Sequence, residues 1–226
     1  DIVIKIYKIL SSVNKKLWNK RKTFRESKKE FVKLDETNKI ISNITEAFHS
    51  KNVIDRIGLI TNIKNLKADA SLYAGGVSMM DNNDFLNPHI DNSHDSSKKN
   101  FRRLNLLYYV SPEWVLDNGG NLELWDNKVE KFTTIISKFN RLVVMKTDKN
   151  SWHSVHPIKV YKQRFCVSNY YFTEQSPDDV NYYHVTSFNG RPEQKFRRFY
   201  CIIDNKIRQK IANFTGLGRG KHLIRK

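Results

Sequence analysis

The chain is poor in cysteine and has no long apolar run. Among its 226 residues only Cys166 and Cys201 are cysteines, and they lack the paired spacing of a metal site. We therefore expect neither a disulfide framework nor a thiolate zinc site. This cysteine usage fits a protein of the reducing cytoplasm, which we expect as its location. No apolar stretch approaches the roughly 18 residues of a membrane span, and Lys5 and Lys8 interrupt the apolar start where a signal core would be continuous. We expect no membrane association.

Acidic residues are also scarce relative to basic ones. The chain has 40 Lys and Arg against 23 Asp and Glu, a formal net charge of +17. Residues 1–70 hold 16 basic and 8 acidic residues, residues 191–226 hold 11 and 2, and residues 71–190 hold 13 and 13. The excess lies entirely in the two flanks. Basic flanks can bind nucleic acid, an acidic protein or a membrane surface, although solvated lysine-rich faces are the simpler interpretation.

The length and the pattern of apolar residues predict one domain with a β core. A content of 39% hydrophobic and 28% charged residues is typical of a globular protein. Helical spacing at Ile6, Ile9 and Val13, and again from Ile40, predicts an N-terminal helical buttress over residues 1–70. Alternating runs predict antiparallel strands at 71–79, 103–110, 121–125, 129–136, 140–146, 151–155 and 164–172. We expect a mainly β fold with flanking helices, whose core at 71–190 is a double-stranded β-helix (jelly-roll, cupin-like), followed by a basic helix and tail at 191–226.

One constellation of side chains in this core has the chemistry of a metal site. The segment NPHIDN places His89 two residues before Asp91. Residues i and i+2 of a strand point to the same side, so the imidazole and the carboxylate can converge on one ion. Downstream, SWHSVHPI offers His153 and His156, of which at most one can point inward from a strand. Two histidines and one carboxylate form the facial arrangement used by non-haem iron(II), and Arg164 on the next strand can clamp a carboxylate.

Around these residues the chain resembles the iron(II)- and 2-oxoglutarate-dependent oxygenases, specifically their prolyl-hydroxylase-like branch. The resemblance extends over about a hundred residues, through LYAGG at 72–76, FLNPHIDN, RRLNLLYYVSPEW, NGGNLELWD, FNRLVVMKTDKNSWHSVHPI and RFCVSNYYF. It implies Fe(II) as the metal and 2-oxoglutarate as the cosubstrate, with ascorbate as a candidate reductant. It further implies oxidative decarboxylation of the cosubstrate to succinate and CO2, coupled to hydroxylation of an unactivated C–H bond.

The resemblance also assigns roles to individual residues. It implies that the catalytic metal ligands are His89, Asp91 and His153. It implies that the residues in contact with 2-oxoglutarate are Arg164, Tyr109, Tyr73 and Cys166. His153 is favoured over His156 because Pro157 stands where the family often has a proline. Cys166 departs from the serine common in relatives. For Tyr73 and Cys166, packing in the core is the alternative interpretation.

Several neighbouring residues have simpler interpretations. His94 and Asp95 follow the ligand pair and are expected to be solvated loop residues. Arg102 and Arg103 open a strand. Either is a candidate for guiding substrate at the rim of the pocket, and an exposed strand start is the alternative interpretation. Three tryptophans are expected in the core or at its rim, at positions Trp114, Trp125 and Trp152.

Three functional hypotheses follow. The first is hydroxylation of an amino-acid residue, prolyl above all, in a peptide or protein. The second is oxidation or demethylation of nucleic acid by the same fold, which the basic flanks favour but the single arginine after the metal histidine does not. The third is a non-catalytic basic jelly-roll binding module. The oligomeric state and the oxidised atom are not given by the sequence.

Overall fold

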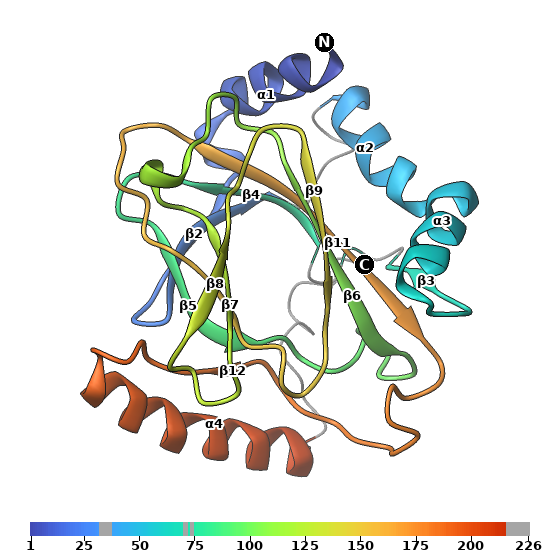
Figure 1. Ribbon diagram of the computed structural model, residues 1–226, viewed down its shortest axis with the longest axis vertical. Helices are drawn as coiled ribbons and strands as arrows, with labels where there is room; N and C mark the ends of the chain where they lie inside the picture. The colour runs from blue at the N-terminus through green and yellow to red at the C-terminus, as the bar shows by residue number, and fades with distance from the viewer. Residues whose placement is uncertain (32–37, 70–71, 73–74, 216–226) are drawn as a thin grey trace.

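The computed structural model describes residues 1–31, 38–69, 72 and 75–215, and its main feature is one curled antiparallel sheet (Figure 1). The main path of the sheet has the order β8-β7-β10-β5-β2-β4-β11-β6-β9, and β1, β3 and β12 pair with its members. The strands are β1 (Asn19–Lys22), β2 (Glu26–Phe31), β3 (Lys67–Ala68), β4 (Gly76–Met80), β5 (Phe85–Ile90), β6 (Phe101–Tyr109), β7 (Leu122–Trp125), β8 (Phe132–Ile135), β9 (Arg141–Lys146), β10 (His153–Val155), β11 (Arg164–Thr173) and β12 (Ser187–Phe188). The expected mainly β, jelly-roll fold class is confirmed.

The strands with the clearest alternation lie where the sequence predicts them. Those expected at 103–110, 140–146 and 164–172 form β6, β9 and β11, with each end shifted by no more than about two residues. β6 and β11 pair over most of their length, and β9 lies on the other side of β6. This long central pair forms the framework on which the site is built.

The polar strand β2 was missed, because the sequence analysis treats residues 1–70 as helical. β2 lies on the main path between β5 and β4 although its sequence is ESKKEF. Its charged side chains form ion pairs: Glu30 contacts Arg21 across the β1–β2 hairpin at 2.6 Å and Lys28 within β2 at 2.7 Å. Phe31 at its end is buried. Cross-strand ion pairs and one apolar anchor thus replace the alternating apolar pattern on which strand prediction depends.

Helices cover the outside of the curled sheet (Figure 1). The described residues form α1 (Ile2–Ser12), α2 (Lys39–His49), α3 (Lys51–Thr61) and α4 (Lys195–Thr215), with short 3-10 turns η1 (Lys15–Leu17) and η2 (Leu116–Asn118). Asp1 and Asn38 cap α1 and α2 by accepting from backbone amides of the first turn. Phe48 and Ile57 bring α2 and α3 onto the outer face of β6 and β11. The other face of these two strands is left for the site.

The two faces of the β6–β11 pair have different roles. Leu104, Leu106 and Tyr171 belong to the cluster under α2 and α3. Tyr109 and Cys166, which are register partners, belong to an inner cluster with Leu107 and Leu122. Alternation along the strands therefore directs apolar residues to the helices and site residues to the inside of the curl.

Candidate metal centre

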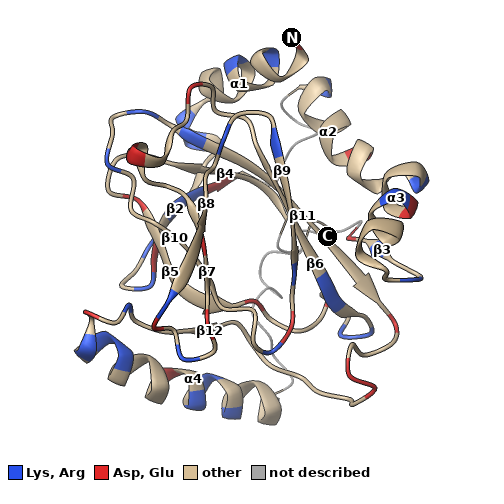
Figure 2. Ribbon diagram, in the orientation of Figure 1, with Lys and Arg blue, Asp and Glu red and all other residues tan. Residues whose placement is uncertain are grey.

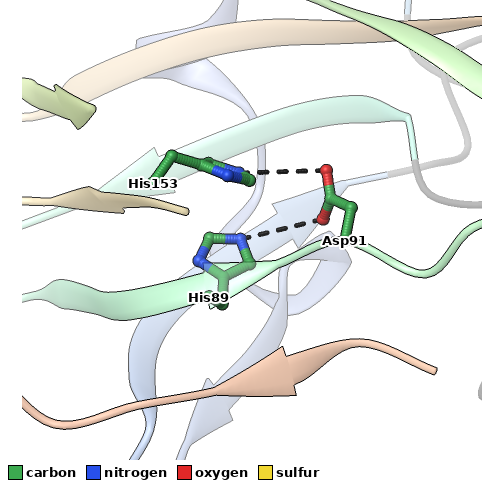
Figure 3. A group of neighbouring side chains, drawn as sticks. All are labelled: His89, Asp91 and His153. Carbon is green, nitrogen blue, oxygen red and sulfur yellow. Dashed lines mark ion pairs between the residues drawn. The ribbon is translucent and has the colours of Figure 1, made fainter. Parts of the chain in front are cut away.

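The centre forms where β5 and β10 pair. His89 on β5 and His153 on β10 are register partners, and Asp91 follows directly after β5. The Nε2 atom of His89 lies 3.7 Å from Oδ1 of Asp91, and the Nε2 atom of His153 lies 3.8 Å from Oδ2 (Figure 3). One ligand atom from each residue lies within 4.8 Å of the others. Antiparallel pairing thus brings together residues that are 62 to 64 positions apart in the sequence.

Backbone carbonyls fix the orientation of both imidazole rings. Nδ1 of His89 lies 3.0 Å from the carbonyl oxygen of Asn87, and Nδ1 of His153 lies 2.9 Å from that of Ser151. A proton on each Nδ1 satisfies these carbonyls and leaves the Nε2 lone pairs facing the carboxylate, which is the usual arrangement of metal-binding histidines. Phe188 of β12 stacks on the His89 ring, with centroids 5.3 Å apart. The donor atoms are therefore positioned by groups outside the centre.

Burial and neighbouring charges set the protonation of the centre. Burial, with the adjacent His153, lowers the pKa of His89 to about 3, so this imidazole is neutral near pH 7. Burial alone would raise the pKa of the Asp91 carboxyl, but the Arg102 guanidinium and the two imidazoles outweigh it and hold that pKa below its usual range. The result is an ionised Asp91 carboxylate beside a neutral His89 imidazole. This donor set suits a divalent transition metal.

The residues fit a bound metal ion. Oδ2 of Asp91 is buried and accepts no hydrogen bond from the described residues, although Arg102 Nη1 forms an ion pair with it at 3.4 Å. A buried carboxylate oxygen without a hydrogen bond is left with capacity for a further partner such as a metal ion. The Nε2 atoms of His89 and His153 lie 3.7 Å and 3.8 Å from the Asp91 oxygens, so the three side chains would hold a metal ion between them. A small relaxation of the side chains would close the set around one ion. Three protein donors leave further coordination positions for small molecules.

A buried cation lies on the neighbouring strand. Arg164 at the start of β11 is 3% exposed, and no carboxylate of the described residues forms an ion pair with it. Its Nε donates to Oγ of Ser137 at 3.1 Å, and its guanidinium lies 4.8 Å from the centre of the Tyr109 ring. An unpaired buried charge is strongly unfavourable, so this guanidinium requires an anion. The carboxylate of a keto diacid would supply one.

The surroundings of Arg164 are equally buried and polar. The Tyr109 hydroxyl is buried without a hydrogen-bond partner in the described part of the chain, and burial raises its pKa to about 12. It therefore remains a hydrogen-bond donor at neutral pH. Gly120 approaches the arginine from the other side, because a Cβ added there would lie 2.9 Å from Cδ of Arg164. Cys166, on the same strand face as Arg164, is fully enclosed, and burial raises the pKa of its thiol. Together with Arg164 these residues form the candidate anion site.

Two further candidates of the sequence analysis are His156, the alternative to His153 as third ligand, and Tyr73. His156 is absent from the group of possible ligands, and its Nδ1 lies 2.8 Å from the carbonyl oxygen of Pro157. Tyr73 lies outside the described residues, and its expected contact with the cosubstrate stays a prediction. Trp114 and Trp125 are buried, as expected, and donate to the Gly119 carbonyl and to Ser154.

The expectations for His94 and Arg102 were wrong. His94 is buried rather than solvated, because the loop returns to form a bridge between His94 and Phe101 and Ser93 Oγ lies 2.7 Å from its Nδ1. Asp95 organises that loop by accepting from Ser97 and from the amide of Lys99.

Arg102 is 2% exposed and lies inside the curl rather than at a rim or an exposed strand start. Its Nη1 is 3.4 Å from Oδ2 of Asp91, and its guanidinium stacks on the Tyr170 ring at 3.9 Å. It touches a proposed ligand and so belongs to the centre. Arg103 instead donates to Thr173 at 3.1 Å and is partly buried.

A buried polar network that the sequence analysis missed supports the strand of His153. Glu123 on β7 is 1% exposed and accepts two hydrogen bonds from Arg191, at 3.2 Å and 2.5 Å. It also accepts from Ser154, its register partner on β10, and Ser154 accepts from the Trp125 indole at 2.8 Å. Glu123 and Arg191 are 68 residues apart, and no sequence spacing signals such a pair.

Comparisons with known proteins agree with the geometry. Residues 75–172 match the profile of the 2OG-Fe(II) oxygenase superfamily. A prolyl hydroxylase from Trichoplax adhaerens, solved with a hypoxia inducible factor peptide fragment, is 21% identical, with 76% of each chain covered and a TM-score of 0.54. A prolyl-4-hydroxylase from Pseudomonas putida is 13% identical over 76% of this chain and 86% of its own, with a TM-score of 0.57. HygX from Streptomyces hygroscopicus, solved with nickel and 2-oxoglutarate, is 10% identical over 77% and 81%, with a TM-score of 0.52.

No curated protein matches the chain. At these identities the solved structures establish the fold alone, while the family profile covers the segment that carries His89, Asp91, His153 and Arg164. Fe(II) and 2-oxoglutarate, the cofactors expected from the sequence, are those that define the matched family. Over residues 75–172 the chain is therefore similar to the 2OG-Fe(II) oxygenase superfamily.

Proposed function

We propose that the protein is an iron(II)- and 2-oxoglutarate-dependent dioxygenase that hydroxylates a prolyl residue in a peptide or protein, with release of succinate and CO2. The observation that carries the proposal is the set of His89, Asp91 and His153 with both Nε2 atoms turned towards the carboxylate. The buried, uncompensated Arg164 on the adjoining strand supports it.

In this proposal His89, Asp91 and His153 would hold the iron. When bound, Fe(II) supplies the activation of dioxygen that 2-oxoglutarate oxidation requires. The carbonyls of Asn87 and Ser151 keep the two imidazoles in the tautomer that offers Nε2. Arg164 would bind the distal carboxylate of 2-oxoglutarate, and the protonated Tyr109 hydroxyl would donate to the same group. Cys166, in place of a serine, would line this pocket.

A peptide substrate is supported by unused hydrogen-bond donors beside the centre. Nε and Nη2 of Arg102 are buried and have no hydrogen-bond partner among the described residues, while Nη1 is directed to Asp91. Donors of this kind suit a substrate carbonyl, and an amide next to a prolyl ring presents one. The Trichoplax adhaerens relative in the fold was solved with a peptide, which supports the same class.

The test measures succinate and the fate of the substrate together. Purified protein with Fe(II), ascorbate and 2-oxoglutarate should form succinate slowly without substrate and faster with proline-containing peptides, which should gain one oxygen by mass spectrometry. His153→Ala should lose this activity, whereas His156→Ala, the matched control, should retain it. Stimulation and formaldehyde release by a methylated oligonucleotide, with no oxygen on any peptide, would contradict the prolyl assignment. An absence of succinate in every reaction would contradict the enzyme assignment.

A further inference from the structure

The C-terminal helix α4 is attached to the protein by its polar face. Asn205 donates to the carbonyl of Phe188 at 2.7 Å and accepts from its amide at 3.0 Å, so it pairs with β12 as a strand would. Gln209 pairs with the backbone of Val185 and Tyr183 in the same way. The buried residues of α4 are small, namely Cys201 and Ala212. These contacts fix which side of the helix faces the barrel.

The apolar face of α4 is consequently turned to solvent. Figure 1 shows the helix along the outside of the curl, beside β12 and on a different side from α2 and α3. Phe196 and Phe214, near its two ends, are each 94% exposed. Between them the exposed apolar side chains are Phe199, Tyr200, Ile202, Ile203, Ile207 and Ile211. A continuous exposed apolar stripe along a helix of 21 residues, about 32 Å long, indicates an interaction surface.

Positive charge flanks the exposed stripe. Lys195, Lys206 and Lys210 are exposed and form no ion pair with any described residue. α4 contains six Lys and Arg residues and a single acidic one, Asp204, which is already paired with Arg25 and Arg208. Figure 2 shows the basic positions along this helix. The eleven residues that follow it in the sequence contain four more Lys and Arg and no Asp or Glu.

Contrary to the expectation of no membrane association drawn from the sequence, we propose that α4 docks the protein flat on an anionic lipid surface. In this arrangement the isoleucines and phenylalanines of the stripe enter the boundary between headgroups and acyl chains, and the flanking lysines contact lipid phosphates and carboxylates. An isolated interfacial helix would turn its polar face to water. In this protein the polar face of α4 holds the helix on β12, through the hydrogen bonds of Asn205 with Phe188. No helix of the described residues is long and apolar enough to cross a membrane, so the attachment is peripheral.

Charge favours a lipid surface over a second copy of the chain. Pairing of two α4 stripes would bring together two basic C-terminal regions, each with 11 basic and 2 acidic residues over 191–226, on chains of net charge +17. That repulsion opposes self-association and strengthens attraction to an anionic surface. Nucleic acid, the other polyanion, offers no apolar surface to cover the phenylalanines and isoleucines.

The experiment is co-sedimentation of the full chain with vesicles of phosphatidylcholine, with or without phosphatidylserine. We expect binding to the anionic vesicles that decreases with added salt. Ile203→Glu/Ile207→Glu should weaken this binding on the order of a hundredfold or more, because two isoleucines that would be buried in the lipid are replaced by charged residues. Lys206→Gln/Lys210→Gln should weaken it roughly thirtyfold, at about 1 kcal/mol for each lysine. Both pairs lie on the exposed side, so the variants should fold normally.

A matched control lies on α3. Leu59 and Ile60 are 78% and 71% exposed, and Leu59→Glu/Ile60→Glu adds the same charge to an apolar patch elsewhere. This variant should bind the anionic vesicles as the unmodified chain does. The proposal is overturned if the unmodified chain does not sediment with anionic vesicles, or if the Ile203/Ile207 variant and the control bind equally. It is also overturned if sedimentation equilibrium shows a dimer without lipid that only the Ile203/Ile207 variant dissociates.

Discussion

The buried Glu123–Arg191 pair should contribute strongly to the stability of the protein. Glu123 is 1% exposed and accepts two hydrogen bonds from Arg191, which lies 5.6 Å from the Trp125 ring and is 9% exposed. Glu123→Leu would leave a buried guanidinium without its counter-charge. Breaking such a pair costs about 3–5 kcal/mol, out of a total of about 5–15 kcal/mol for a typical domain. For a chain of this size the melting temperature should fall by roughly 6–20 °C.

A double-mutant cycle separates the ion pair from simple packing. Urea unfolding is measured for the unmodified chain, Glu123→Leu, Arg191→Met and the double variant. We expect the double variant to be more stable than Glu123→Leu alone, because it no longer buries an unpaired charge. Because Glu123 also accepts from Ser154, the residue after His153, Glu123→Leu should weaken metal binding as well. Additive losses in the cycle, or a Glu123→Leu cost within about 0.5 kcal/mol, would refute this reasoning.

The remaining predictions concern the candidate anion site around Arg164 and the β1–β2 hairpin. Arg164→Met should raise the KM for 2-oxoglutarate about a hundredfold or more in a succinate assay while leaving metal binding intact, and an unchanged KM would place the cosubstrate elsewhere. Gly120→Ala should destabilise the protein by about 1–3 kcal/mol in urea unfolding, because φ is +64° and a Cβ would approach Cδ of Arg164 at 2.9 Å. Burial alone would raise the pKa of the Glu30 carboxyl, but the charges of Lys28 and Arg21 outweigh burial and lower that pKa below 4.5. The ionised carboxylate therefore contributes its full stabilisation above pH 4.5, and this contribution is lost as the pH falls through the lower pKa of the folded state. Glu30→Gln should flatten the acid limb of stability between about pH 5 and pH 3, and an unchanged limb would argue against the ion pairs.

The sequence predicts those parts of the fold that local patterns encode. β6, β9 and β11 are short runs rich in Val, Leu, Tyr and Phe, so their positions follow from residue type. β2 does not alternate between apolar and polar residues. It is stabilised by the ion pair of Glu30 with Arg21 across the hairpin and by that of Glu30 with Lys28 within the strand. No pattern within ESKKEF distinguishes that strand from a solvated charged segment.

The position of Arg102 shows a second limit. Strict alternation down β6 from Tyr109 would place Arg103, not Arg102, on the inner face. The register with β11 shifts between Tyr171 and Phe172, so that Arg102 lies opposite Phe172 and faces Asp91. This β-bulge reverses the faces, and its position depends on the partner strand rather than on the sequence of β6 alone.

The candidate site divides in the same way. His89, Asp91 and Arg164 can be found by local spacing and residue type, and the resemblance adds His153. Long-range contacts such as Glu123 with Arg191, or Asn205 with Phe188, leave no local signal because their partners are brought together only by the fold. The apolar stripe of α4 likewise predicts a helix, but its outward orientation depends on hydrogen bonds to β12.

The most direct test of the central claim is the stoichiometry of metal binding under anaerobic conditions, measured by calorimetric titration with Fe(II). The account predicts one ion for each unmodified chain and for His156→Ala, and no binding at this site by His89→Ala, Asp91→Ala or His153→Ala. Retention of the ion by His153→Ala together with its loss in His156→Ala would contradict the account.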